Sequence, residues 1–122
     1  MTRSGGQTTA WRRIALLVEG DAALSKVLQR ELKSRAVIAV DSVAKAVRVL
    51  ETETRIDVLI CSYRVQDGTA RRLFALAMQR WPRVRRILCD EKIRLDRRSA
   101  RSAIALSDAV VVEFSELRRI VG

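Results

Sequence analysis

Few side chains in these 122 residues could carry out chemistry, and they are scattered along the chain. There is no histidine, and the two cysteines, Cys61 and Cys89, do not fill a four-ligand zinc site. Each cysteine ends an apolar run, where a reduced, buried cysteine usually lies, although a disulfide between them is the alternative. No nucleophile–base pair, metal-ligand cluster or glycine-rich phosphate loop is apparent. The sequence therefore predicts no enzyme, no metal site and no cofactor.

Short apolar runs alternate with amphipathic stretches, a rhythm that predicts a doubly wound α/β fold with a parallel sheet. Asp21, then Asp41 or Ser42, and later Ser115 are predicted to cap helices, and Thr69 is predicted to begin one. A further helix is expected over roughly Leu95–Leu106. The five predicted strands are Ile14–Val18, Ala36–Val40, Val58–Cys61, Ile87–Cys89 and Ala109–Val112. A ligand site in such a sheet lies at the carboxyl ends of the strands.

Length and composition indicate one domain. A chain of 122 residues with 48% hydrophobic content can bury a single core, which we assign to residues 12–122 after a flexible tail at 1–11. No apolar run approaches the roughly 18 residues that cross a bilayer, and the N-terminus does not resemble a secretory signal. We expect a cytoplasmic protein that has no membrane partner.

The net charge of +10, from 24 basic and 14 acidic residues, would attract nucleic acid, acidic proteins or anionic membranes. Only four of the basic residues are lysine, so the excess is almost all arginine. Arginine-rich coding in a high-GC genome would give the same composition without any function. Charge alone does not choose among these alternatives.

At the predicted carboxyl ends the chain resembles the receiver domain of bacterial response regulators, the CheY-like family, from about Arg12 to Gly122. Three segments carry the resemblance: Ala15–Asp21 with its acidic residues, Asp57–Gly68 with a loop after the third strand, and Ser107–Ser115 before the last helix. The resemblance implies a flavodoxin-like five-stranded parallel sheet of strand order 2-1-3-4-5. It also implies a role in two-component signalling.

The resemblance places Ser62 where the family has the aspartate that accepts the phosphoryl group. A serine would give a stable phosphoester, and with no histidine in the chain no adjacent base is expected to activate it. Glu19 stands at the first of two magnesium-binding acids, but Gly20 replaces the second, and Asp21 should point elsewhere if it caps a helix. Magnesium binding should be weak or absent.

Two more positions depart from the family pattern. The hydroxyl residue expected after the fourth strand reads Cys89, and the lysine expected after the fifth reads Val112. Glu113 follows where the family usually has proline, so the positive charge is not displaced by one position. We predict a degenerate pocket, a pseudo-receiver that takes no small-molecule substrate, although the altered pocket could instead bind another small ligand.

The segment from Arg71 to Arg101 holds eleven basic residues and three acids. Arg94, Arg97, Arg98 and Arg101 recur at helical spacing and predict a basic stripe on one helical face. In the family, the fourth helix, fifth strand and fifth helix form the usual dimer and partner surface. A solvated, arginine-rich face is the plain alternative.

Two functional interpretations follow. The favoured one is a phosphorylation-independent adaptor that binds a protein, including a second copy of itself, through the basic stripe and through Leu117, Ile120 and Val121. The other is a regulatory domain that binds nucleic acid through the Arg71–Arg101 surface, although no helix-turn-helix or RNA-binding signature is present. The last helix is also short for the family, which is expected either of a trimmed domain or of a longer protein that has been cut.

Overall fold

The computed structural model describes residues 12–90 and 98–121, and these form a five-stranded parallel sheet. The order β2-β1-β3-β6-β7 is the predicted 2-1-3-4-5, which confirms the flavodoxin-like fold. The first two strands match their predicted bounds, while β3 and β6 begin two residues earlier and β7 ends one residue earlier than predicted. The strands are β1 (Ile14–Val18), β2 (Ala36–Val40), β3 (Ile56–Cys61), β6 (Arg85–Cys89) and β7 (Ala109–Val111).

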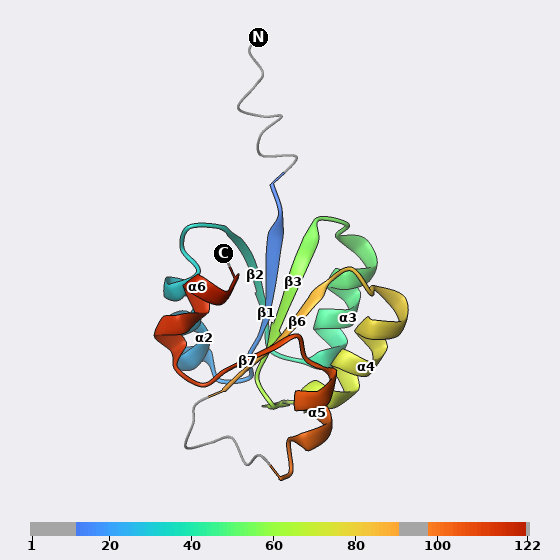
Figure 1. Ribbon diagram of the computed structural model, residues 1–122. Helices are drawn as coiled ribbons and strands as arrows, with labels where there is room; N and C mark the ends of the chain where they lie inside the picture. The colour runs from blue at the N-terminus through green and yellow to red at the C-terminus, as the bar shows by residue number, and fades with distance from the viewer. Residues whose placement is uncertain (1–11, 91–97, 122) are drawn as a thin grey trace.

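Helices cover both faces of this sheet (Figure 1). On one face lie α3 (Val43–Thr52), α4 (Ala70–Arg80) and α5 (Arg101–Leu106), and on the other lie α2 (Ala22–Glu31) and α6 (Leu117–Val121). The alternation of strand and helix produces this layering, because each parallel crossover lays its helix on the sheet. No helix in residues 12–90 and 98–121 is long and apolar enough to span a membrane.

The helix starts follow capping chemistry in two of the predicted places. The Asp21 carboxylate accepts hydrogen bonds from the backbone N–H groups of Ala23 and Leu24, at 2.9 and 3.1 Å. Ser42, and not Asp41, caps α3 by accepting from the N–H of Lys45. Both caps satisfy donors that the first helical turn leaves free.

Two predicted helix boundaries are wrong. The helix expected over roughly Leu95–Leu106 begins at Arg101, after a turn at residues 98–100, and residues 91–97 lie outside the described part. Ser115 does not cap the last helix, because it lies inside a 3-10 turn, η1 (Phe114–Glu116), that leads into α6. The turn allows the chain to change direction from β7 and lay Leu117 against the sheet.

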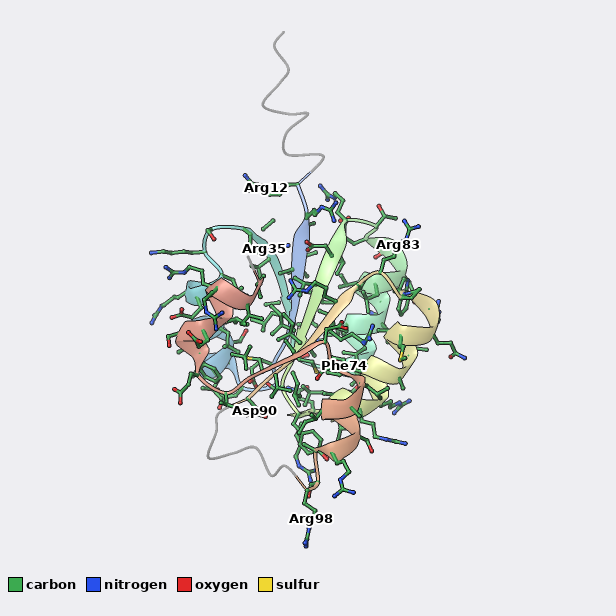
Figure 2. The ribbon with its side chains drawn as sticks, viewed as in Figure 1. Arg12, Arg35, Phe74, Arg83, Asp90 and Arg98 are labelled. Carbon is green, nitrogen blue, oxygen red and sulfur yellow. The ribbon has the colours of Figure 1, made fainter. Side chains whose placement is uncertain are left out.

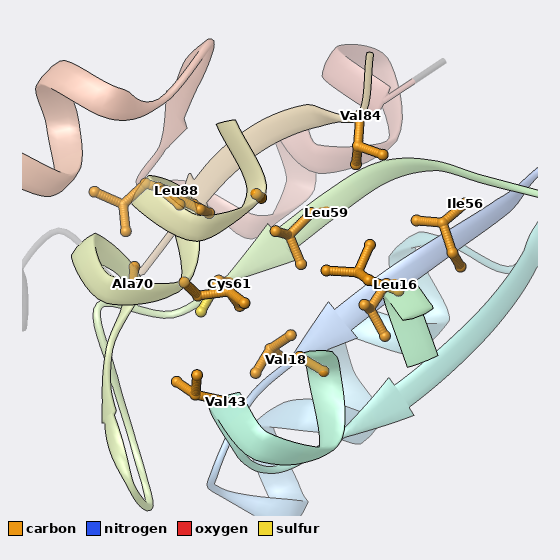
Figure 3. Close-up of a cluster of buried hydrophobic side chains, with 14 of the residues drawn as sticks. Leu16, Val18, Val43, Ile56, Leu59, Cys61, Ala70, Val84 and Leu88 are labelled. Carbon is orange, nitrogen blue, oxygen red and sulfur yellow. The ribbon is translucent and has the colours of Figure 1, made fainter. Parts of the chain in front are cut away.

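Two apolar layers hold the sheet between the helices. Alternate residues of β1 point to opposite faces, so Leu16 and Val18 join the layer under α3, α4 and α5, while Ala15 and Leu17 join the layer under α2 and α6. Figure 3 shows the first layer, where Leu16, Val18, Leu59 and Cys61 face Val43 and Ala70. The central strands are apolar on both faces because both are covered.

Candidate functional site

Three buried polar residues, Glu19, Ser62 and Asp90, each come directly after a central strand, β1, β3 or β6. The carboxyl ends of parallel neighbours lie at one edge of the sheet, so these three residues lie at the same edge. They are 3%, 1% and 3% exposed, respectively. The edge thus holds a compact polar site under the surface.

The hydroxyl of Ser62 donates a hydrogen bond to the Oε1 atom of Glu19. The expectation that Ser62 has no basic neighbour is therefore wrong. The 43 residues that separate the two positions hide this contact in the sequence, and the pairing of β1 with β3 creates it. Because both side chains are almost fully buried, the pair is a structural hydrogen bond inside the fold and not an exposed nucleophile with its base.

The acidic residues after β1 are already engaged. The Oε2 atom of Glu19 accepts from the backbone N–H of Asp21 at 3.0 Å, so both carboxylate oxygens of Glu19 have protein donors. Asp21 is exposed and turned to the start of α2, as predicted from its capping role. These two acids do not converge.

Cys89 does not supply the hydroxyl, and Val112 does not supply the positive charge, that the resemblance to receiver domains implies at these positions. Cys89 is 1% exposed, and burial together with the nearby Asp90 carboxylate raises the pKa of its thiol to about 12. Val112 is half-buried against the first apolar layer and carries no charge. Cys61 and Cys89 are free thiols in different apolar layers, so they form no disulfide.

Asp90 is a site residue that the sequence reasoning missed. Its carboxylate accepts from the backbone N–H of Tyr63 at 3.1 Å, and the Tyr63 hydroxyl donates to the carbonyl oxygen of Ser99 at 2.8 Å. The signal was available, because Asp90 is an acid placed directly after the predicted strand Ile87–Cys89. Asp90 ties the end of β6 to the loop after β3.

A hairpin of β4 (Arg64–Val65) and β5 (Gly68–Thr69) follows Tyr63 and reaches across to Gly20. A Cβ atom added at Gly20 would lie 3.5 Å from the backbone nitrogen of Gln66, an ordinary van der Waals contact. Gly20 therefore leaves room for a side chain but does not supply a ligand.

A cavity of about 430 Å³ opens beside this hairpin, between α2 and the start of α3. Glu19, Gly20, Lys26, Lys45 and Gln66 are among its lining residues, and Ser62 is not. Lys45 is paired with Asp41 at 3.0 Å. The cavity does not lead to the serine.

These residues do not fit a magnesium ion with a phosphoryl group. Magnesium needs a near-octahedral set of oxygen ligands, usually with one or two free carboxylates. In the described residues no group of three metal-ligating side chains could hold a metal, and the two oxygens of Glu19 are taken up by Ser62 and Asp21. The observed geometry provides no such site.

The basic segment from Arg71 to Arg101 does not form one surface. Arg71 lies at the start of α4 and Arg83 follows its end, while Arg98 lies at the opposite end of the sheet from Arg83 (Figure 2). The physical reason is that α4 and β6 each run the length of the domain in opposite directions. The chain therefore reaches the edge where the strands begin after α4 and returns to the opposite edge after β6. Arg98 and Arg101 are exposed, with Arg98 in a turn and Arg101 beginning α5; Arg94 and Arg97 lie outside the described residues.

Leu117 and Val121 are not available as partner contacts. Leu117 is 0% exposed and Val121 is 6% exposed, and both pack in the second apolar layer with Leu28 and Leu32. Ile120 is half-buried against the same layer. The apolar face of this short amphipathic helix packs on its own sheet. Sequence periodicity does not distinguish such a face from one that docks on a partner.

No protein-family model matches this sequence, and no curated protein matches it either. Several solved structures, in contrast, have a similar fold. A signal receiver domain of an HD domain-containing protein from Pseudomonas fluorescens Pf-5 superposes with a TM-score of 0.80 at 20% identity, covering 90% of this chain and 84% of that one. A response regulator receiver protein from Pseudomonas putida gives a TM-score of 0.78 at 20% identity, covering 90% and 95%.

The chain has the fold of a response-regulator receiver domain. The response regulator TrrA from Thermotoga maritima, solved in complex with Mg²⁺ and BeF, superposes with a TM-score of 0.76 at 17% identity, covering 89% of this chain and 96% of that one. On the receiver fold, Ser62, Glu19 and Asp90 lie at the sheet edge where doubly wound proteins place their sites.

Proposed function

We propose that this chain is a receiver-fold domain that acts in bacterial signalling or regulation by binding a protein partner, and that phosphorylation does not switch it. The observation that carries the proposal is the buried hydrogen bond from Ser62 to Glu19. It occupies the hydroxyl at the position where the resemblance places a phosphoryl acceptor.

Three chemical reasons support phosphorylation independence. Ser62 is 1% exposed, so a phosphoryl donor does not reach it without opening of the site. A phosphoserine there would place its negative charge beside the Glu19 carboxylate, and the two like charges would repel each other. Val112 offers no positive charge from the end of β7.

A partner-binding role is supported by the fold and by one face of it. The structures similar to this chain are described as receiver domains and response regulators. In this chain α5 and α6 flank the edge strand β7 from opposite faces of the sheet. This α5–β7–α6 face carries the exposed Arg101, the exposed Arg98 in the turn before α5, and the half-buried Val110 and Ile120. We assign this α5–β7–α6 face to the partner, for which a second copy of the chain is one candidate.

The first test asks whether the pocket responds to a phosphoryl donor. Wild-type protein is incubated with acetyl phosphate and magnesium and followed by intact mass, and the NMR signals of Glu19, Ser62 and Val112 are recorded with magnesium and beryllofluoride. We expect neither added mass nor shifted signals. The matched variant, Ser62→Asp with Gly20→Asp, restores two acids where Gly20 has room for a side chain, and is expected to bind magnesium. A saturable, magnesium-dependent response of the wild type would overturn the proposal.

The second test examines the face. Arg98→Glu with Arg101→Glu reverses two charges on the α5–β7–α6 face, while Arg48→Glu with Arg71→Glu makes the same change in net charge on α3 and α4. Sedimentation velocity reports self-association, and capture on immobilised protein reports other partners. Loss of association in the first variant only supports the assignment, whereas equal behaviour of both variants contradicts it.

A further inference from the structure

The edge of the sheet where the strands begin, opposite to Ser62, is rich in cations. Because all five strands are parallel, the segments that lead into them meet at this edge. Figure 2 shows Arg12, Arg35 and Arg83 at this end and Asp90 and Arg98 at the other. The basic residues in these segments and at the first positions of the strands are Arg12, Arg13, Lys33, Arg35, Arg55, Arg83, Arg85 and Arg86.

Every described acid at this edge already has an arginine partner. Asp57 pairs with Arg35, Glu53 pairs with Arg55 at 2.9 Å, and Asp108 faces Arg86 at 3.7 Å. The acids at the ends of the helices that lead into these segments are engaged as well: Glu31 faces Arg118 at 4.0 Å, and Glu51 pairs with Arg80 at 3.1 Å.

Five cations are left over, and we name them the amino-edge cluster: Arg12, Arg13, Lys33, Arg83 and Arg85. All five are exposed, and in the described part of the chain none forms an ion pair with an acid. Arg85 donates to the carbonyl oxygen of Ile120 at 3.0 Å, a contact that holds the guanidinium in place without neutralising it. The opposite edge differs, because Glu19, Asp21, Asp67 and Asp90 lie there among its basic residues.

The chemistry of the amino-edge cluster selects a polyphosphate partner. Four of its five members are arginine, whose planar guanidinium binds phosphate oxygens through two hydrogen bonds. The cluster contains no exposed apolar side chain of the kind that centres a protein interface or inserts into a membrane, since the exposed large apolar residues, Val27 and Met78, lie on α2 and α4. In the described residues no aromatic ring is fully exposed for stacking on unpaired bases.

We propose that the amino-edge cluster binds the phosphate backbone of duplex DNA without reading its sequence. Neutralising backbone phosphates releases counterions, so affinity falls steeply as salt rises. The cluster shares no residue with the α5–β7–α6 face, although Arg85 contacts Ile120 of that face. The two proposals are tested with different residues, Arg12, Arg13 and Arg83 here and Arg98 and Arg101 there, so either can fail without the other.

The test measures fluorescence anisotropy of a labelled duplex of arbitrary sequence with the full chain, between about 50 and 200 mM salt. With three to five phosphates contacted, a plot of the logarithm of the association constant against the logarithm of salt concentration should have a slope of about −2.7 to −4.5. The triple variant Arg12→Ser, Arg13→Ser and Arg83→Ser should reduce the magnitude of this slope by about 2 to 3. It should also weaken binding at low salt by about tenfold or more.

The matched control is Arg48→Ser, Arg64→Ser and Arg71→Ser, which removes the same charge from exposed positions on α3, β4 and α4. We expect it to weaken binding by less than about threefold, with the slope unchanged. Equal losses in both triple variants would show that net charge alone attracts DNA and would overturn the site, as would no binding by the wild type. Equally tight, cluster-dependent binding of polyglutamate or of phosphatidylserine vesicles would overturn the choice of DNA.

Discussion

The carboxylate of Asp67 accepts a hydrogen bond from the backbone N–H of Val43 at 2.6 Å, and its second oxygen accepts from Ala44 at 3.0 Å. Asp67 lies in the turn of the β4–β5 hairpin, and Val43 is the first residue of α3. A residue from a distant loop thus helps to cap this helix, alongside Ser42. The contact fixes the hairpin over the carboxyl edge of the sheet.

Replacing Asp67 with alanine should lower the free energy of unfolding by about 1 kcal/mol, the usual cost of losing a helix cap. The hydrogen bonds from Ala44 and Val43 lower the pKa of Asp67 in the folded state. This stabilisation is therefore complete above the carboxyl's unfolded pKa of about 4 and is lost as pH falls through the lower folded pKa. Urea unfolding at pH 7 and at pH 3 should show the difference between wild type and variant shrinking at the lower pH. A difference that stays constant would show that the carboxylate charge plays no part in the cap.

Removing the hydroxyl of Ser62 should destabilise the domain without affecting any phosphoryl chemistry. Ser62→Ala leaves the buried Oε1 atom of Glu19 without its donor, which costs about 1–3 kcal/mol. The control, Ser102→Ala, removes a hydroxyl from an exposed position on α5 and should change stability by less than about 0.5 kcal/mol. Guanidinium unfolding followed by circular dichroism measures both. If the two serines prove equivalent, the Ser62–Glu19 hydrogen bond does not hold the site.

Substituting Ser62 with aspartate alone should destabilise the domain in a pH-dependent way. A carboxyl group at this buried position lies against Glu19, and two neighbouring carboxylates disfavour double ionisation. One of the two groups then keeps a proton to a higher pH in the folded state, so the variant is closest to wild type near pH 4 and loses stability as pH rises toward 7. Thermal unfolding across this range tests the sign, and a variant that gains stability with pH would contradict it.

Both cysteines should be unreactive in the folded protein. Burial raises the pKa of the Cys61 thiol far above its usual range and that of Cys89 to about 12, so little thiolate forms at pH 8. Ellman's reagent at pH 8 is expected to modify neither thiol until guanidinium unfolds the chain, and then to modify both. Rapid labelling of the folded protein would show that one apolar layer opens readily.

Truncating Phe74 should destabilise the domain more than the loss of a helix cap or of a buried hydroxyl. Phe74 is fully buried on the inner face of α4, within the layer that joins α3, α4 and α5 to the sheet. Phe74→Ala should cost about 3–5 kcal/mol, whereas Met78→Ala, on the exposed side of the same helix, should cost less than about 1 kcal/mol. Chemical denaturation distinguishes the two, and similar losses would mean that α4 is packed differently.

The sequence by itself determined the order of strands and helices, because apolar runs covered on both faces and amphipathic helices have different periods. The run Ile14–Val18 suited a strand covered on both faces, and Asp21 could be recognised as a cap from its place just before the apolar positions of α2. The positions of Glu19 and Ser62 followed as well, since each comes directly after such a strand.

Tertiary structure decided which of these residues touch and which are accessible. The hydrogen bonds of Ser62 with Glu19 and of Asp67 with Val43 join residues far apart in the chain, and only strand pairing brings them within reach. Leu117 turned out to be core and not contact surface, because a helix stripe has the same spacing whether it faces its own sheet or a partner. The arginines that crowd one stretch of sequence were divided between two ends of the sheet, since α4 and β6 each cross the domain. The sequence gives the number and order of the charged residues, but which of them share a surface depends on where the chain reverses direction.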